Sequence, residues 1–139
     1  MIVLDTNVLS EPLRVAPDPH VTRWLTTSDA SVAITAVSVG ELLTGARRLP
    51  HGRRREGLLE AIESIIDSFS GSILPFDAAA ARRYATMQEA RRSAGHPLST
   101  EDGMIAAICA SHDAVLATRN TKDFDHLGVP LVDPWSSTP

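Results

Sequence analysis

Short apolar runs alternate in this chain with longer stretches of helical periodicity, and this alternation limits the folds that are open to it. Five runs have the length of buried strands: Ile2–Leu4, Ser31–Thr35, Ile73–Phe76, Ala114–Thr118 and Pro130–Val132. Four stretches between them repeat apolar residues as helices do: Val37–Arg47, Gly57–Phe69, Ala78–Arg92 and Thr100–His112. The alternation predicts a three-layer α/β/α sandwich, with helices on both faces of a mostly parallel sheet.

The size of the chain predicts one domain, residues 1–139. A chain of 139 residues that is 43% hydrophobic and 22% charged has the composition of a globular domain with a single core. Pro12, Pro17 and Pro19 are expected to break the first helical region into a short helix and a loop. The tail from Asp133 is expected to be irregular, with Trp135 packed on the domain.

The same totals bear on the compartment. The one cysteine, Cys109, excludes an internal disulfide, which suits a reducing environment. The N-terminus has no basic region of a signal peptide, and no apolar stretch approaches the roughly 20 residues that span a bilayer. We therefore expect a cytoplasmic protein with no membrane partner.

The net charge of −4 provides no overall attraction to nucleic acid, so such binding would require a local basic patch. Basic side chains gather in two stretches: Arg47, Arg48, His51, Arg53, Arg54 and Arg55, and then Arg82, Arg83, Arg91 and Arg92. Each stretch is either a solvated helix face or a phosphate-binding surface, and the sequence leaves both interpretations open.

Asp5 follows the first apolar run directly, where a strand ends and a helix begins. Ligands of a parallel sheet bind at the carboxyl ends of its strands, so a carboxylate there can belong to an active site. Asp is also a favoured helix N-cap, which explains the residue equally well. The polar Thr6 and Asn7 that follow could line the same place.

Glu41 lies within the predicted helix Val37–Arg47. A helical wheel places it almost opposite an apolar stripe formed by Ala36, Val39, Leu43 and Ala46. That position is typical of a solvated surface glutamate. Gly40 and Gly45, however, each cost a helix about 1 kcal/mol, which suggests that something must approach the backbone beside Glu41.

Asp102 lies in the first turn of the last predicted helix, where Ser99 with Asp102 fits a capping box. It also shares a face with Ile105 and Cys109, which should pack on the sheet. A carboxylate that points toward a core needs a partner, and a metal ion would serve. Glu101 projects near the same stripe, so the spacing does not choose between the two acids.

Asn120 follows the fourth predicted strand, and either it or Thr121 could cap a helical turn there. Arg119 is either a surface charge or a phosphate contact. Cys109 is expected in the core, since no histidine spacing indicates a zinc site.

Asp5, Glu41 and Asp102 come from separate elements and would repel one another at one sheet edge unless a divalent cation lay among them. Oxygen-only ligands favour Mg²⁺ or Mn²⁺ over zinc. A metal held by carboxylates with open positions is the usual equipment for phosphodiester hydrolysis.

Four segments match a known pattern in the same order along the chain: Ile2–Glu11, Ser38–Leu42, Glu101–Ala107 and Ala117–Phe124. They resemble the PIN domain family, and specifically the VapC/FitB type of toxin from bacterial toxin–antitoxin pairs. The closing Val132–Trp135 resembles the usual end of such toxins, so the resemblance spans almost the whole chain.

The resemblance implies a Mg²⁺-dependent ribonuclease, with Mn²⁺ as a substitute, that is usually a homodimer and is inhibited by a small VapB/FitA-like antitoxin. By position, Asp5, Glu41 and Asp102 match the three core acids of the family, with Asp5 and Asp102 as direct metal ligands. Many relatives carry Asp at a fourth position, where this chain has Asn120, with Asp123 three residues further on. The number of bound ions therefore stays open.

The expected reaction is attack of an activated water on the RNA phosphate, which leaves a 5′-phosphate and a 3′-hydroxyl. Glu41 is expected to hold or deprotonate that water, and Thr6 and Asn120 to orient the acids. An arginine from the antitoxin would be a natural competitor for the acidic site.

Two other functions would also begin from Asp5. A haloacid-dehalogenase-like phosphatase requires a second Asp at position 7, where this chain has Asn7. A receiver-type signalling domain would use Asp77 and Lys122, which leaves the other conspicuous acids without a role.

Overall fold

The computed structural model describes residues 1–28 and 30–136 of the chain. In that part of the chain a five-stranded sheet forms, with the strand order β3-β2-β1-β4-β5, and all four strand pairings are parallel. The strands are β1 (Ile2–Leu4), β2 (Val32–Thr35), β3 (Ile73–Leu74), β4 (Val115–Ala117) and β5 (Leu131–Val132). The five predicted strands and the parallel sheet are confirmed.

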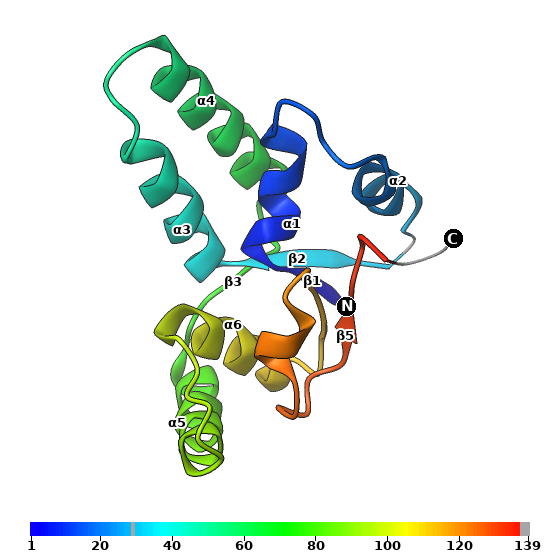
Figure 1. Cartoon of the computed structure of the whole chain (residues 1–139), viewed down its shortest axis with the longest axis vertical. Helices are drawn as coiled ribbons and strands as arrows, with labels where there is room; N and C mark the ends of the chain where they lie inside the picture. The colour runs from blue at the N-terminus through cyan, green and yellow to red at the C-terminus, as the bar shows by residue number, and fades with distance from the viewer. Residues whose placement is uncertain (29, 137–139) are drawn as a thin grey trace.

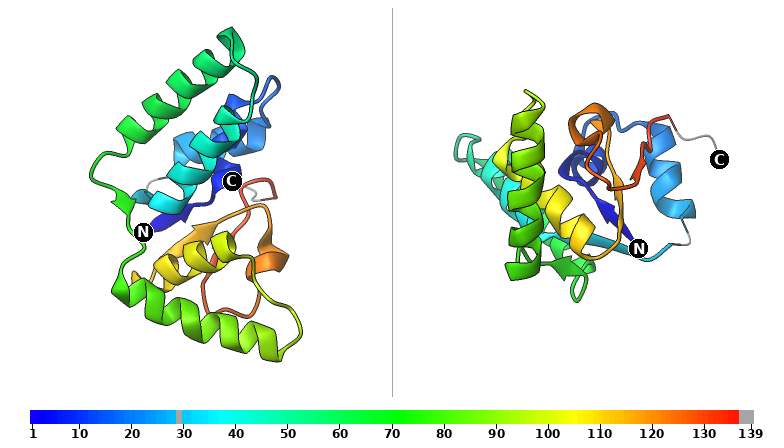
Figure 2. Two further views of the ribbon diagram at one scale, coloured as in Figure 1. Left: turned by 90° about the vertical axis from the view of Figure 1, so that its left-hand side faces the viewer. Right: turned by 90° about the horizontal axis from the view of Figure 1, so that it is seen from below.

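Helices cover both faces of this sheet (Figure 1). They are α1 (Thr6–Ser10), α2 (Pro19–Thr27), α3 (Ala36–Arg47), α4 (Arg53–Ser68), α5 (Ala78–Ser93) and α6 (Thr100–Ser111), with the 3₁₀ turns η1 (Glu11–Leu13) and η2 (Thr121–Phe124). The first four lie on one face, and α5 and α6 pack together on the other (Figures 1 and 2). The predicted α/β/α sandwich is therefore confirmed. No helix of the described residues is long and apolar enough to cross a membrane.

The sheet separates two buried cores because successive strand residues point to opposite faces. In β1, Val3 packs in the core beneath α5 and α6, whereas Leu4 packs in the core beneath α1 to α4. In β4, Leu116 and Ala117 divide in the same way. Trp135 packs on the second of these cores, as expected.

Helix α2 is the main departure from the predicted elements. The prolines were expected to leave only a loop there, but Pro19 is the first residue of α2, and Asp18 caps that helix by accepting a hydrogen bond from the backbone N–H of His20. Proline is tolerated at this position because the first helical N–H groups have no intrahelical partner. Helix α4 also begins four residues earlier than predicted, at Arg53.

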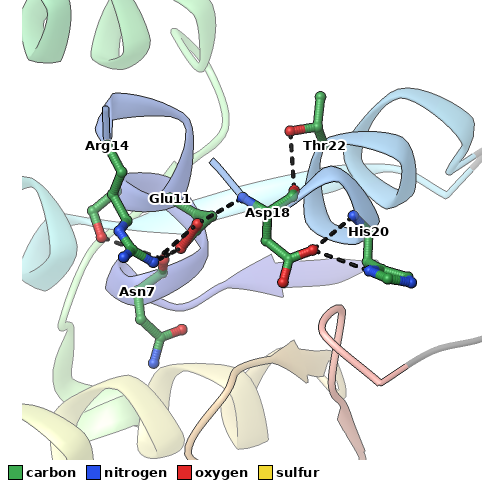
Figure 3. A network of polar contacts seen from close by, with 7 residues as sticks. Asn7, Glu11, Arg14, Asp18, His20 and Thr22 are labelled. Atoms are coloured by element: carbon green, nitrogen blue, oxygen red, sulfur yellow. Dashed lines mark hydrogen bonds and ion pairs between the residues drawn. The ribbon is translucent and has the colours of Figure 1, made fainter. Parts of the chain in front are cut away.

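A buried glutamate fixes the start of α2 against the end of α1. Glu11 is 3% exposed, and its carboxylate accepts hydrogen bonds from the Arg14 guanidinium at 3.0 Å and from the Asp18 backbone N–H at 3.1 Å (Figure 3). The Asp18 N–H, followed by Arg14, lowers the pKa of Glu11, so the carboxylate stays charged. The contacts hold the proline-containing loop in one conformation.

Candidate functional site

Asp5 lies at the carboxyl end of the central strand and is 4% exposed. Its Oδ1 accepts a hydrogen bond from the backbone N–H of Thr6 at 2.8 Å, and this is the N-cap contact of α1. Its Oδ2 accepts the hydroxyl of Thr118 at 2.7 Å and, at 3.4 Å, the side-chain amide of Asn7. Asp5 is thus both a helix cap and the centre of a polar network between β1 and β4.

Burial raises the pKa of Asp5 to about 6. The negative charges of Asp102 and Glu41 also raise it, while the hydrogen bonds from Thr118 and Thr6 oppose the rise. Asp5, at the end of β1, therefore lies in the electrostatic field of both other predicted acids, although those come from α3 and α6. A positive charge among them would relieve the repulsion.

Glu41 is half-buried and is held by α1. Thr6 donates its hydroxyl hydrogen to Glu41 Oε1 at 2.7 Å, and the Thr6 oxygen lies 2.8 Å from the hydroxyl of Ser38. Because the single hydroxyl hydrogen of Thr6 is used toward Glu41, Ser38 is the donor in the second contact. The expected orienting contact of Thr6 with an acid is therefore present.

The predicted apolar stripe of α3 is confirmed at three of its four residues. Val39, Leu43 and Ala46 pack on the core beneath α1 to α4, whereas Ala36 is exposed. The predicted position of Glu41 is wrong, because it lies three residues after the buried Ser38 and so borders the buried face instead of opposing it. The helical wheel missed this because a serine, and not an apolar side chain, occupies the start of the buried face.

Asp102 is half-buried at the start of α6, on the same face as the fully buried Ile105 and Cys109. The predicted cap is present, since the Ser99 hydroxyl accepts the Asp102 backbone N–H at 3.2 Å. Burial raises the pKa of Asp102, as do the charges of Asp123 and Glu101. Of this pair, Asp102 is the acid whose charge acts on Asp5, whereas Glu101 is exposed.

Asn120, at the fourth predicted position, joins the polar network of Asp5 and Thr118 through its backbone N–H. The Asn120 N–H donates to the Thr118 hydroxyl oxygen at 3.0 Å, and the Asn120 side chain makes no cap contact with η2, so of the two residues that could cap this turn Asn120 does not. Asp123 follows on η2, and its charge reaches Asp102. Buried Phe124 anchors this turn to the core beneath α6.

Thr118 is the site residue that the sequence did not reveal. It is fully buried, and its hydroxyl donates to Asp5 while accepting from the Asn120 N–H and, at 3.5 Å, from Asn7. The available signal was a threonine at the end of an otherwise apolar strand. Such a residue needs a hydrogen-bond partner when the strand is central.

Two arginines are already engaged in contacts within the chain. Arg119 lies 5.1 Å from the ring centre of Trp135, a cation–π arrangement, and its backbone N–H donates to Asn7 Oδ1. Arg91 donates to the backbone carbonyls of His96, Asp123 and Asp125. Arg91 therefore supports η2, so the second basic stretch is not simply a free phosphate-binding surface.

The donor chemistry of the site fits a hard divalent cation. Asp5, Glu41 and Asp102 offer only oxygen ligands, and their mutual repulsion is what a cation would relieve. In the described part of the chain, no three Asp, Glu, His or Cys side chains lie close enough to hold one ion as they stand. Neighbouring carboxylates are thus present without a closed ligand shell. Cys109 is buried with a pKa raised to about 12 by burial, so it is an inert core thiol, as expected.

Comparisons with known proteins agree with this geometry. The family model described as PIN domain matches residues 2–130. The toxin FitB of Neisseria gonorrhoeae is 39% identical to this chain, covering 97% of it and 99% of that protein. The VapC ribonuclease Y4jK of Sinorhizobium fredii is 36% identical, covering 97% of this chain and 98% of that protein.

The solved structures lead to the same family. A chain in the structure of FitAB bound to the IR36 DNA fragment superimposes with a TM-score of 0.93 at 38% identity. That match covers 100% of this chain and 99% of the other. The agreement therefore extends over every layer of the sandwich.

Proposed function

The chain belongs to the PIN domain family, and from this membership we propose that it is the toxin of a toxin–antitoxin pair, a Mg²⁺-dependent endoribonuclease that hydrolyses RNA phosphodiester bonds. The similarity to proteins named toxin FitB and VapC ribonuclease supports both halves of this proposal. The lone, buried Cys109 is compatible with the cytoplasm, where such a toxin would meet its RNA.

The observation that carries the proposal is the setting of Asp5. Its carboxylate lies at the end of the central strand, is 4% exposed and is repelled by the charges of Asp102 and Glu41. Among the described residues, no Lys, Arg or His side chain lies at hydrogen-bond distance from it. Burying an ionised carboxylate without a cation lowers the stability of a folded protein, and carboxylates in this setting are common at functional sites.

Asp5 and Asp102 would hold Mg²⁺ directly, with Glu41 close by, and Mn²⁺ would be accepted by the same oxygens. When bound, the ion lowers the pKa of a water molecule and offsets the charge that develops on the phosphoryl oxygens. Whether one or two ions bind depends on Asn120 and Asp123, since an amide at the fourth position is a neutral ligand.

The protein's own groups would orient and deprotonate the attacking water. Thr118 fixes Asp5 Oδ2, and Thr6 fixes Glu41 Oε1, so that the free lone pairs of both carboxylates have defined directions. Glu41 accepts a proton from the water as its oxygen bonds to phosphorus. The bond from phosphorus to the 3′-oxygen breaks, the 3′-oxygen takes a proton from solvent, and the products are a 5′-phosphate and a 3′-hydroxyl.

The proposed partners are RNA as the substrate, an antitoxin of the VapB/FitA type, and a second copy of this chain in a homodimer. The superposition on the FitAB chain over its full length supports an antitoxin partner of that type. An arginine of the antitoxin would reach the three carboxylates and compete with the metal ion, because a guanidinium pairs well with carboxylates.

Cleavage of total RNA by the purified protein tests the proposal, with Mg²⁺ or EDTA, and with Asp5→Asn as the inactive control. We expect metal-dependent cuts that bear 5′-phosphates and that are absent in the variant and with saturating antitoxin. Cleavage that persists in EDTA and in Asp5→Asn would indicate a contaminating nuclease. A folded, antitoxin-free protein that leaves RNA intact would refute the ribonuclease assignment.

A further inference from the structure

A hollow of about 340 Å³ opens between α3 and α6 directly beside Glu41. We refer to it as the α3–α6 hollow. Its lining residues are Val37, Gly40, Glu41, Thr44, Arg48 and Glu101. The hollow shares Glu41 with the acidic site, and its other acid, Glu101, directly precedes Asp102 in the chain.

Gly40 lies in the interior of α3, where glycine destabilises a helix relative to alanine. A Cβ atom at this position would meet no atom within 4 Å. Gly103 in α6 is different, because a Cβ there would lie 2.8 Å from the ring of Tyr84. Packing within the chain therefore accounts for Gly103, whereas Gly40 leaves the floor of the hollow open for a molecule from outside.

Arg48 provides the charge at the far end of the hollow. It lies seven residues after Glu41, or about 10 Å along the helix axis. It is exposed, and no carboxylate of the described residues lies within ion-pair distance of it. A phosphate bound there would be a different one from the phosphate that is cleaved at the acids.

Resting on the proposed function, we propose that the α3–α6 hollow binds one nucleotide of single-stranded RNA next to the scissile phosphate, with the phosphate of that nucleotide on Arg48. Gly40 allows the sugar to approach the helix backbone closely. The basic residues that follow Arg48 in the chain add positive charge beyond the end of α3, which suits the continuing RNA backbone.

Glu101 forms the opposite rim of the hollow. Its carboxylate repels phosphate but accepts hydrogen bonds, so this rim suits the ribose 2′-hydroxyl or an amino group of the base. The two rims thus give the nucleotide one orientation, with its phosphate at the end of α3 and its donor groups at the start of α6.

The test measures binding of a fluorescein-labelled, single-stranded RNA pool of random sequence by polarisation, in EDTA so that the RNA is not cut. The variants are Gly40→Gln, which fills the hollow, and Arg48→Gln. Gly57→Gln is the control for the first, because Gly57 lies inside α4 and a Cβ there also meets nothing. Arg47→Gln is the control for the second, since Arg47 ends the same helix but does not line the hollow.

We expect Gly40→Gln and Arg48→Gln each to weaken binding about fivefold or more, while both controls bind like the unaltered protein. Arg48→Gln should also reduce the slope of log affinity against log salt by about 0.7, the value for one lost phosphate contact on a single strand. Thermal melting should show Gly40→Gln to be at least as stable as the unaltered protein, as for Gly57→Gln, which excludes misfolding as the cause.

Three results would overturn this inference in distinguishable ways. Equal binding by all variants, with Mg²⁺-dependent cleavage intact, would refute nucleotide binding in the α3–α6 hollow and leave the proposed function unaffected. A change of molecular mass in Gly40→Gln alone, by light scattering, would show that the hollow is an interface between copies of this chain. Absence of both binding and cleavage in the unaltered protein would refute the proposed function, and the hollow proposal with it.

Discussion

The hydroxyl of Thr118 lies 2.7 Å from Oδ2 of Asp5, although 113 positions separate the two residues in the chain. The contact follows from the parallel pairing of β1 with β4, in which Leu4 is opposite Ala117. The next residue of each strand therefore meets the other at the sheet edge. A threonine for which the sequence predicted no role thus determines how the buried acid presents its free lone pairs.

Removal of this hydroxyl should impair catalysis. In Thr118→Val we expect the cleavage rate to fall about tenfold to hundredfold, because a hydrogen bond to a charged group contributes about 1.5–3 kcal/mol. The affinity for Mn²⁺, measured by calorimetry, should fall as well. Thr118→Ser retains the hydroxyl and should recover most of both quantities. Equal loss in the valine and serine variants would show that the methyl packing, and not the hydroxyl, is required.

Asp5→Asn should be inactive but more stable than the unaltered protein in metal-free buffer. Burial raises the pKa of Asp5 from its ordinary 3.8 to about 6, so the folded protein binds the proton more tightly than the unfolded chain. The stabilisation from protonation is complete below about pH 3.8 and is lost as the pH rises through about 6. At pH 8 the asparagine variant should therefore be more stable by at most about 3 kcal/mol.

Urea unfolding in EDTA at a series of pH values measures this difference. The advantage of Asp5→Asn should shrink steadily as the pH falls and should vanish near pH 4. An advantage that stays constant with pH would mean that the asparagine acts through packing and that the carboxyl group does not titrate as described.

Asn120→Asp should bind divalent metal more tightly. The substitution adds a third carboxylate to those of Asp102 and Asp123, and we expect the dissociation constant for Mn²⁺ to fall about tenfold. In metal-free buffer the same charge should lower the stability of the protein. Thr86→Asp is the matched control, since it adds a carboxylate on the exposed surface of α5. A similar gain in that control would indicate a general effect of net charge.

Gly103→Ala should destabilise the domain even though alanine favours helices. The new Cβ would lie 2.8 Å from Tyr84 and 3.0 Å from Gln88, so α5 and α6 must separate or the ring must move. We expect a net loss of about 1–2 kcal/mol in the free energy of unfolding. Gly57→Ala has open space and should instead gain about 0.5–1 kcal/mol. Equal gains in both variants would show that Tyr84 moves aside freely.

The sequence predicted the sheet well because each strand is a short apolar run bounded by polar residues, as in Ile2–Leu4 before Asp5. It did not predict α2, because a proline that follows a helical segment was interpreted as a helix breaker. Pro19 is instead the first residue of α2, which becomes clear only when Asp18 is recognised as the N-cap. The position of a proline relative to a cap decides between these outcomes.

Asp5 and Asp102 were identified from their places at the ends of elements and Glu41 from the glycines beside it, and Thr6 was expected as an orienting group, but which acid Thr6 contacts was not predicted. The hydrogen bond of Thr6 to Glu41 spans 35 positions, and it depends on how α1 packs against α3. The wheel of α3 missed Ser38 for a related reason, since this buried serine donates a hydrogen bond to Thr6 and accepts one from Thr35. Such polar partnerships across elements leave no periodic signal in one sequence.

The central place of β1 in the sheet has a consequence for the synthesis of the protein. A ribosome makes β1 first, but β4, which lies beside it and carries Thr118 at its end, leaves the ribosome only after most of the chain has been made. An incomplete chain therefore holds Asp5 and Glu41 without the strand that orients Asp5. We therefore expect the acidic site to take its final geometry only after β4 has paired with β1.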